Sequence, residues 1–321
     1  MAPIEPLLLI STILALCFAQ RLIRNEYTVN IVILGPGAVG TLWAVKLAQA
    51  GHNVSVWSRS SKDTIHCSLQ GELTQHTFCN CNEVSLENAD LILITVKAWQ
   101  VSSAIEPLLE KLHPDLIVLF MHNGMGTIDY LINSLPNNPL LFATTSHGAL
   151  KITSSEVKHT GWGETKLGAL NQKGLSCEFL TQVLNHALKP VEWQKNIHHS
   201  LLLKLAVNCA INPLTSLNNI RNGQLSTDAY LPLLERLLDE ICCVINAEGL
   251  VITREALTKV VNKVITSTAD NYSSMHQDIA QQRRTEIDFI TGYLLERAEF
   301  HNIAVPTNES LFQKIKKIEG K

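Results

Sequence analysis

Three polar side chains in the stretch LLLKLAVNCAINPLT, residues 201–215, have types and a spacing that could do chemistry. Lys204, Asn208 and Asn212 recur at every fourth residue. At about 100° per residue they fall within roughly 80° of arc, on one face of a helix. The rest of the stretch is almost wholly apolar, which predicts a buried helix, and burying these groups without partners costs several kcal/mol. We therefore expect this polar stripe to face a polar ligand.

The chemistry that suits such a stripe is the reduction of a carbonyl group. Burial lowers the pKa of a lysine, so Lys204 can protonate the oxygen that a hydride transfer leaves behind. Asn208 and Asn212 can orient the hydroxyl, carbonyl or carboxylate groups of a substrate. The stripe would then face substrate and cofactor across an interdomain cleft. The alternative is a surface lysine with two asparagines near a helix end, because Pro213 is expected to bend or stop the helix.

Two residues further along the chain are also candidates. Glu286, in RRTEIDFITGYLL, lies on a helical wheel between the directions of Ile290 and Tyr293, which places a carboxylate in an apolar sector. It can pair with Lys204, with a substrate hydroxyl or with the neighbouring Arg283. Ser274, in NYSSMHQD, either caps the helix that follows or binds a substrate carboxylate.

A glycine-rich segment predicts a nucleotide site. Gly35, Gly37 and Gly40 form the pattern G-x-G-x-x-G between a strand-like run and a helical one. In that context the glycines allow a tight turn, let the backbone approach a pyrophosphate and seat the helix against the strand. The residues expected to bind the dinucleotide here are Gly35, Pro36, Gly37, Ala38, Val39 and Gly40. The alternative is a purely structural turn.

The choice of dinucleotide depends on the end of the second strand. Proteins that select NAD usually place Asp or Glu there, whereas this chain has WSRSSK, with Arg59 between serines and Lys62 close by. A guanidinium can hold a 2′-phosphate with two hydrogen bonds, which favours NADP(H) over a chance surface arginine. Lys97 and Asn123 follow two later strands and are expected at the same edge of the sheet, unless they are solvated loop residues.

Strands and helices alternate along the first part of the chain. The runs VNIVILG, HNVSVWSR, ADLILITVKAW and DLIVLFMHNG predict buried parallel strands with helices between them. LLFATTSHGAL is expected to add a strand to the same sheet, and GWGETKLGAL to begin a more antiparallel section. This part of the chain therefore predicts a Rossmann-type, doubly wound sheet.

The last part of the chain predicts helices only. They are expected at residues 197–211, 230–248, 254–268 and 279–301, with a short final helix from residue 310. The predicted fold class is α/β followed by all-α. The predicted domains are an NADP-binding domain at 29–195 and a helical substrate domain at 196–321. Residues 1–28 are expected to be an extension outside the fold, such as an upstream start. The apolar run PLLLISTILALCFAQ leaves a cleaved leader or a weak membrane anchor as alternatives.

Composition limits the remaining possibilities. The chain has 321 residues, of which 46% are hydrophobic, and a formal net charge of -3. With no basic tract of five or more residues, a nucleic-acid partner is not expected. The eight cysteines have no C-x-x-C spacing, so we expect free thiols in a reducing compartment, the cytoplasm, and no metal site. The sequence does not fix whether the protein is a monomer or a homodimer.

Eight segments stand in one order between Val29 and Phe312: GPGAVG, TVKAWQV, HNGMGT, TTSHGA, KLAVNCAINPLT, NGQL, SSMHQDI and RRTEIDFITGYL. Together they resemble the ketopantoate reductase (2-dehydropantoate 2-reductase) family. The first strand of that family normally lies at the N-terminus, so the resemblance does not extend to residues 1–28.

The resemblance implies the reduction of 2-dehydropantoate to (R)-pantoate by NADPH, in pantothenate and coenzyme A biosynthesis. It makes Lys204 the general acid at the ketone oxygen. Arg59 and Lys97 would contact the adenosine phosphate and the ribose region, and no metal is required. The substrate contacts that it implies are Asn123, Asn208, Asn212, Asn222, Ser274 and Glu286. The further coenzyme contacts that it implies are Asn123, Ala149 and Glu286.

Two other functions fit the same residues. One is a related NADP-dependent reductase that acts on a different 2-keto or 3-hydroxy acid. The other is an NADP(H)-sensing protein without catalysis, in which Lys204 would have no chemical role. The small-molecule substrate is the partner expected in the first case, and no membrane partner is expected in either.

Overall fold

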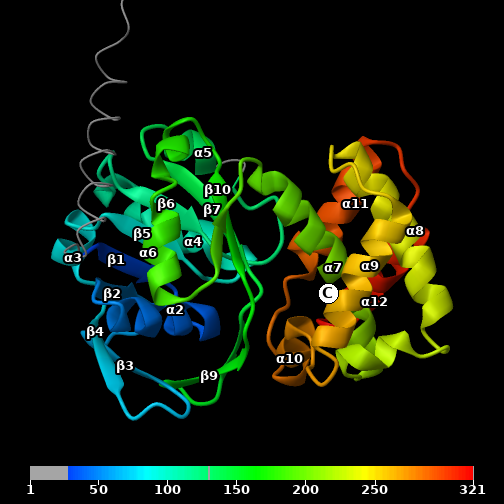
Figure 1. Ribbon diagram of the computed structural model, residues 1–321, viewed down its shortest axis with the longest axis horizontal. Coiled ribbons are helices and arrows are strands. Elements are labelled where there is room, and N and C mark those ends of the chain that lie inside the picture. Colours follow the sequence, from blue (N-terminus) through cyan, green and yellow to red (C-terminus); the bar gives the residue numbers. More distant parts are fainter. Residues whose placement is uncertain (1–27, 129–130, 321) are drawn as a thin grey trace, which may run out of the picture. The chain divides into compact units, whose positions relative to one another are not determined.

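The computed structural model describes residues 28–128 and 131–320, and they divide into two compact units (Figure 1). The first unit holds residues 28–122 and 131–197, and the second holds residues 123–128 and 198–320. Residues 123–128 thus belong with the helical unit, although they lie within the range that the sequence assigns to the sheet. The expected N-terminal extension lies outside the described residues except for Thr28.

A mixed seven-stranded sheet forms the centre of the first unit. β1 lies between β2 and β5: the next strand in the chain, β2, pairs with one edge of β1, and the later strand β5 pairs with the other edge. The order of the strands therefore reverses at β1, which makes its carboxyl end a topological switch point. β7 and β10 are antiparallel, and the other neighbouring strands are parallel. In spatial order the strands are β11 (Val191–Trp193), β10 (Thr165–Ala169), β7 (Leu140–Thr145), β6 (Ile117–Phe120), β5 (Leu91–Ile94), β1 (Asn30–Leu34) and β2 (Asn53–Trp57).

A second, four-stranded sheet was not expected from the sequence. Its order is β4 (Gln75–Cys79), β3 (Thr64–Leu69), β9 (Glu156–Gly161) and β8 (Gly148–Lys151). The prediction that LLFATTSHGAL adds a strand to the main sheet is confirmed for β7, which pairs with β6, but it is wrong beyond Thr145, because β8 pairs with β9 in this second sheet. The antiparallel section expected around residues 161–170 is confirmed, since β10 pairs antiparallel with β7.

Helices of the first unit cover the sheet and complete its core. The α-helices are α2 (Ala38–Gln49), α3 (Glu83–Glu87), α4 (Val101–Ile105), α5 (Leu131–Ser134) and α6 (Leu180–Ala187). The 3-10 helices are η1 (Ala98–Gln100), η2 (Glu106–Lys111) and η3 (Lys173–Cys177). Helix α2 packs against α6 and against both sheets, and it buries Leu42, Trp43 and Val45 completely. This packing fixes the start of α2 directly after β1, where the glycine motif lies.

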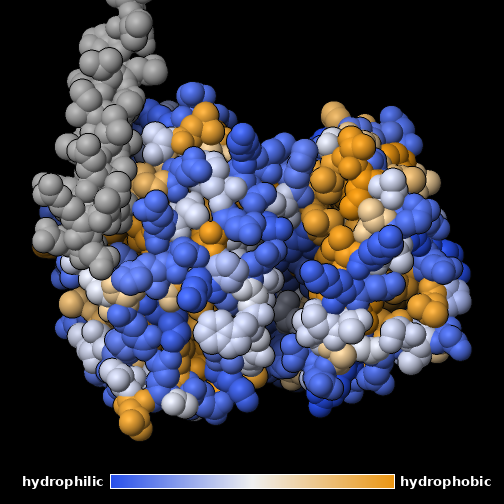
Figure 2. All heavy atoms as spheres, viewed as in Figure 1, coloured by the Kyte–Doolittle hydropathy of each residue, from blue (hydrophilic) through white to orange (hydrophobic). Residues whose placement is uncertain are grey.

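The second unit is helical, as predicted. Its α-helices are α7 (Ile197–Asn218), α8 (Leu231–Ala247), α9 (Arg254–Ser267), α10 (Ser274–Ala280), α11 (Thr291–Phe300) and α12 (Pro306–Ile318), with 3-10 helices η4 (Asn222–Ser226) and η5 (Ile287–Phe289). The expected α/β plus all-α class is thus confirmed. On the face drawn in Figure 2, hydrophobic residues are scattered over the first unit and form larger areas over the second.

Two helix predictions are wrong. Helix α7 continues past Pro213 to Asn218 instead of ending near Ile211. The expected helix 279–301 is broken: α10 ends at Ala280, Gln282 has a left-handed φ of +52°, and α11 begins only at Thr291. Glu286 therefore lies in a loop between helices and not on a helix face.

Helix α7 is the described helix with the length and mean hydropathy, 1.3, to cross a membrane. However, 67% of its most apolar window is buried inside the protein, which is typical of the core helix of a globular unit. Leu205, Cys209 and Ile211 are among its buried residues.

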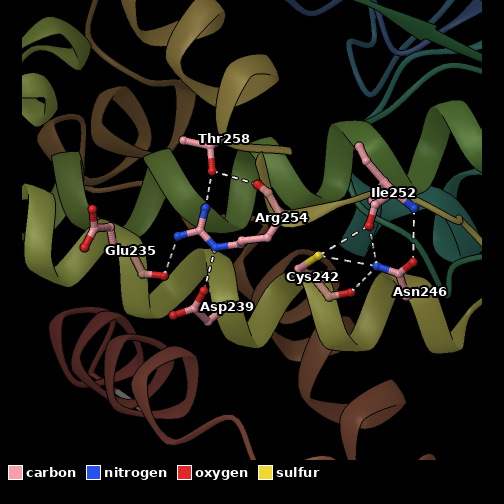
Figure 3. Close-up of polar contacts among 7 residues, drawn as sticks. All are labelled: Glu235, Asp239, Cys242, Asn246, Ile252, Arg254 and Thr258. Atoms are coloured by element: carbon pink, nitrogen blue, oxygen red, sulfur yellow. Dashed lines mark hydrogen bonds and ion pairs between the residues drawn. The ribbon is translucent and has the colours of Figure 1, made fainter. Parts of the chain in front are cut away.

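Polar contacts hold the connection between α8 and α9 (Figure 3). Asn246 Nδ2 donates to the carbonyl oxygen of Ile252 at 2.9 Å, and its Oδ1 accepts from the backbone N–H of the same residue at 3.0 Å. Arg254 Nε donates to Asp239 Oδ1 at 2.6 Å. The two helices are thus joined at their connecting loop and again between the first residue of α9 and Asp239 in the middle of α8.

Candidate functional site

Lys204 lies on α7 and is half-buried, and Leu201 and Leu205 on the same helix are buried. Burial lowers the pKa of Lys204 to about 8, and the carboxylate of Glu286 acts against this by stabilising the ammonium form. An ammonium group with a pKa near neutrality holds its proton at physiological pH and can release it readily. These are the properties that a general acid requires.

Glu286 is buried, with 4% of its surface exposed. It precedes η5, and its backbone oxygen accepts hydrogen bonds from the N–H groups of Phe289 and Ile290, both at 3.0 Å. Its Oε2 accepts a hydrogen bond from Asn123 Nδ2 at 3.3 Å. Because a buried carboxylate is costly without partners, the amide of Asn123 and the ammonium of Lys204 account for its presence here.

The segment that carries Asn123 is docked on the loop that carries Glu286. The N–H of Met125 donates to the carbonyl oxygen of Phe289 at 2.9 Å. Gly124 has φ +82°, and a Cβ at that position would lie 2.6 Å from the same oxygen. The glycine is therefore required both by its backbone conformation and by this close approach. The glycines of HNGMGT are the sequence signal for this close approach, and the segment belongs with the helical unit although its place after β6 predicts the edge of the sheet.

The structure places the other substrate candidates in the same unit but in different environments. Asn208 is half-buried on α7, and Asn212 is buried on it. Asn222 is buried at the start of η4, where its Nδ2 donates to Thr268 Oγ1 at 2.9 Å and its Oδ1 has no protein partner among the described residues. A buried acceptor without a protein partner is uncommon, and this one marks Asn222 as a residue that is not satisfied by the fold alone. Ser274 is exposed.

The capping role considered for Ser274 belongs instead to its neighbour, Ser273. Ser273 Oγ accepts from the N–H of His276 at 3.2 Å, which caps α10, and it shares a hydroxyl–hydroxyl hydrogen bond with Thr215 Oγ1 at 2.8 Å. This second bond ties α10 to α7, three residues beyond Asn212. Sequence reasoning missed Ser273 and Thr215, although a pair of serines before a helix always leaves two candidates for the cap.

In the first unit, the glycine motif forms the turn from β1 into α2. Gly35 has φ +88°, and its N–H donates to the carbonyl oxygen of Trp57 at 2.9 Å, which connects the turn to the end of β2. Gly40 is buried, and a Cβ there would lie 2.5 Å from the Gly35 oxygen and would collide with Thr95 Oγ1. Thr95 closes the turn from the β5 side by donating to the Gly35 oxygen at 2.8 Å.

Gly37 differs from these two glycines because its surroundings are open. A Cβ there would meet no atom closer than the Gly35 oxygen at 4.0 Å, and Gly37 is exposed. It is the N-cap of α2, which has no side-chain cap and no acidic residue in its first turn. An open helix N-terminus of this kind fits the pyrophosphate of a dinucleotide. Pro36, Ala38 and Val39, which complete the motif, are half-buried.

The remaining coenzyme candidates lie at strand ends. Arg59 is exposed two residues beyond β2, and Lys97 is half-buried as the N-cap of η1, after β5. Ala149 is half-buried in β8, opposite His159 of β9, and packs against the core of the unit. The structure thus brings the motif and the ends of β2 and β5 to one edge of the main sheet, whereas Ala149 comes from the second sheet.

Residues that could bind a metal are not grouped in the described part of the chain. It contains no cluster of three or more His, Cys, Asp or Glu side chains with suitable geometry. The seven described cysteines carry no disulfide, and Cys17 lies outside the described residues.

Comparison with known proteins covers both units. Residues 31–172 match the family model for ketopantoate reductase PanE/ApbA, and residues 196–319 match the model for the C-terminal part of the same family. A 2-dehydropantoate 2-reductase from Vibrio cholerae is 51% identical over 290 residues, which are 90% of this chain and 98% of that protein.

Solved structures show the same fold. A D-mandelate dehydrogenase, in a ternary structure with NADH and anilino(oxo)acetate, is 23% identical and gives a TM-score of 0.82, over 90% of this chain and 98% of that one. A ketopantoate reductase from Ralstonia eutropha is 24% identical and gives a TM-score of 0.79 over the same shares. Both family models and the long match to the Vibrio cholerae protein lead to one conclusion: this chain belongs to the ketopantoate reductase family.

Proposed function

We propose that this chain reduces 2-dehydropantoate to (R)-pantoate with NADPH, a step in the synthesis of pantothenate and coenzyme A. Family membership and the 51% identity to a 2-dehydropantoate 2-reductase support this reaction. The observation that carries the proposal is the half-buried ammonium of Lys204, whose pKa lies near 8 beside a buried carboxylate. A reductase of ketones needs a proton donor with this property.

Each of the proposed site residues has its own role in the reaction. Lys204 Nζ protonates the oxygen of the C2 ketone as the carbon is reduced. Asn208 and Asn212, on the same face of α7, orient the hydroxyl and carboxylate groups of the substrate, and Asn222 and Ser274 hold it from η4 and α10. Asn123 and Glu286 contact both substrate and coenzyme, and Glu286 keeps Lys204 protonated.

The coenzyme assignment goes beyond the nicotinamide chemistry of the family. The bound coenzyme supplies the hydride. The N–H groups at the start of α2, with Gly37 open to solvent, would hold its pyrophosphate. Arg59 would bind the 2′-phosphate of NADPH, with Lys97 at the ribose and Ala149 beside the coenzyme. The absence of a carboxylate at the end of β2 supports NADPH over NADH.

We place the coenzyme site in residues 29–195 and the substrate site in residues 196–321, with Asn123 contributed from the first range. The only partner in this proposal is the small-molecule substrate. The unbridged thiols of the described cysteines support the cytoplasm as the compartment.

An NADPH oxidation assay against a panel of 2-keto acids tests the proposal. We expect kcat/KM for 2-dehydropantoate to exceed that for each other acid by about tenfold or more. A phenyl-substituted 2-keto acid belongs in the panel because a D-mandelate dehydrogenase shares this fold. Faster reduction of another acid would establish a different reductase, and NADPH binding without turnover of any acid would establish a non-catalytic protein.

A further inference from the structure

We propose that Asn80 is a positioning residue for coenzyme choice, because its buried side chain fixes the loop of residues 58–62 that presents Arg59. This inference rests on the proposed use of NADPH and assigns a new residue to that preference. Asn80 follows β4 and is remote in sequence from the glycine motif, so no dinucleotide pattern includes it.

The amide of Asn80 uses both of its donors and its acceptor on this one loop. Its Oδ1 accepts from the N–H of Ser58 at 3.0 Å. Its Nδ2 donates to the carbonyl oxygen of Ser60 at 3.0 Å and to that of Lys62 at 2.7 Å. The side chain therefore holds three alternate residues of the loop, and it does so with 6% of its surface exposed.

The backbone around Asn80 is itself fixed to the main sheet. The N–H of Asn80 donates to the carbonyl oxygen of Asp63 at 2.8 Å, just beyond the loop. Asn80 also forms a bridge with Val56 of β2, and the N–H of Cys81 donates to the Val56 oxygen at 3.0 Å. The residue that carries the amide is thus held against β2, the strand that leads into the loop. The side chain of Asn80 therefore fixes residues 58–62 relative to β2.

Contacts within the loop complete its shape without a ligand. Ser58 Oγ accepts from the N–H of Ser60, and Ser60 Oγ accepts from the N–H of Lys62, both at 3.2 Å. The cationic residues, Arg59 and Lys62, remain exposed. A loop with fixed backbone and outward cations is suited to a phosphate dianion, since little conformational entropy is then lost on binding.

This arrangement has a consequence that separates the two coenzymes. NADH lacks the 2′-phosphate and gains nothing from Arg59, so loosening the loop should leave NADH binding unchanged. NADPH should bind more weakly, because a loosened loop would have to become ordered when NADPH binds and the lost conformational entropy would reduce the affinity. Proton transfer from Lys204 does not involve the loop, so kcat should stay the same for both coenzymes.

Steady-state kinetics of Asn80→Asp and Asn80→Ala with both coenzymes provide the test. Asn80→Asp has nearly the same volume but loses both donors to Ser60 and Lys62. We expect KM for NADPH to rise about tenfold or more, with kcat and the KM for NADH unchanged. In an Arg59→Ala background the same substitution should add nothing to the NADPH-to-NADH ratio of kcat/KM. The matched control is Asn82→Ala, which removes an exposed asparagine that caps α3 through the N–H of Ser85.

The outcomes distinguish this inference from the proposed function. If wild-type protein prefers NADPH and Arg59→Ala abolishes the preference, but folded Asn80→Asp retains it, the role of Asn80 is wrong and NADPH use stands. An equal loss with both coenzymes also overturns it, because it would show a general structural effect. Wild-type protein without a preference overturns NADPH use and this inference together. Urea unfolding of each variant establishes that it is folded. If Asn80→Ala does not fold, the kinetics of Asn80→Asp alone provide the test.

Discussion

Asn123 Nδ2 lies 3.3 Å from Glu286 Oε2, although 163 residues separate the two in the chain. The contact joins the segment after β6 to the loop between α10 and α11, and the docking of Met125 on Phe289 reinforces it. Glu286 in turn stabilises the ammonium form of Lys204. An amide, a carboxylate and an ammonium from three distant parts of the sequence therefore form one electrostatic unit, and most of our predictions concern it.

The rate of ketone reduction should depend on the protonation of Lys204. The group donates a proton only as the ammonium, whose pKa is about 8. The rate should be steady at lower pH and should fall about tenfold per pH unit above that pKa. Lys204→Met should lower kcat about a hundredfold or more and remove this dependence. Single-turnover rates against pH measure both effects, and an unchanged profile in Lys204→Met would exclude Lys204 as the acid.

The same substitution should make the protein more stable when the buried carboxylate of Glu286 is replaced as well. The folded-state pKa of Lys204, about 8, lies below its ordinary value, so the folded protein disfavours the charged form. The free-energy cost of the buried ammonium is fully present at pH values below 8, and it disappears as the pH rises toward the ordinary pKa of the lysine. In a Glu286→Gln background, where no buried carboxylate is left without its cation, Lys204→Met should therefore raise the free energy of unfolding at neutral pH by roughly 1–3 kcal/mol. Urea unfolding at neutral and at alkaline pH measures this, and the gain should shrink at alkaline pH.

Glu286→Gln should move the pH profile without abolishing the reaction's need for Lys204. The Glu286 carboxylate raises the pKa of Lys204, so a neutral amide should let that pKa fall further. The alkaline limb of the rate profile should shift to lower pH by the same amount. Asp288→Asn is the control. It removes a carboxylate from the same loop, but this carboxylate pairs with Lys316 and Arg284 and not with Lys204. A shift of equal size in both variants would contradict a specific pairing.

Gly37→Ala and Gly40→Ala should differ in what they damage. A Cβ at Gly37 would meet only the Gly35 oxygen, at 4.0 Å, so the fold should keep its stability while KM for the coenzyme rises. A Cβ at Gly40 would lie 2.5 Å from the Gly35 oxygen, so that variant should lose about 1–3 kcal/mol of stability. Thermal unfolding and coenzyme titration of the pair separate the two effects. Equal destabilisation of both would mean that Gly37 is a structural glycine.

Asn246→Ala should weaken the helical unit without affecting the chemistry. It removes both hydrogen bonds to the backbone of Ile252 (Figure 3), and each such bond contributes on the order of 1 kcal/mol. We expect a loss of about 1–3 kcal/mol in the free energy of unfolding, with KM for the substrate unchanged. Asn262→Ala, which alters an exposed residue of α9, is the control and should cost almost nothing. Equal losses in the two variants would contradict this role for Asn246.

Short-range patterns predicted the parts of the fold that depend on neighbouring residues. The β1–turn–α2 unit was predictable because its glycines, its apolar strand and its helical spacing are adjacent in sequence. Helix α7 was predictable from its apolar length, but not its end: Thr215 Oγ1 bonds the oxygens of Ile211 and Asn212, and the helix passes Pro213.

Long-range contacts decided what the sequence could not predict. The sheet that contains β3 depends on its pairing with β9, about 90 residues later. The helix expected at 279–301 has suitable periodicity throughout, yet the N–H of Thr285 donates to Glu319 Oε1 at 2.7 Å, outside any helix. For the site, the stripe on α7 followed from spacing alone. The pairing of Glu286 with Asn123 did not, since no local pattern relates residues so far apart.

The assignment of residues 123–128 to the helical unit means that the polypeptide passes between the units more than once, before residue 123, after residue 128 and again near residue 197. A gene fragment that starts at residue 198 would encode every helix from α8 onward and nearly all of α7, but it would lack the strap that covers Phe289 and supplies the partner of Glu286. Dissection of this enzyme into independently expressed halves would therefore have to graft that six-residue strap onto the helical half.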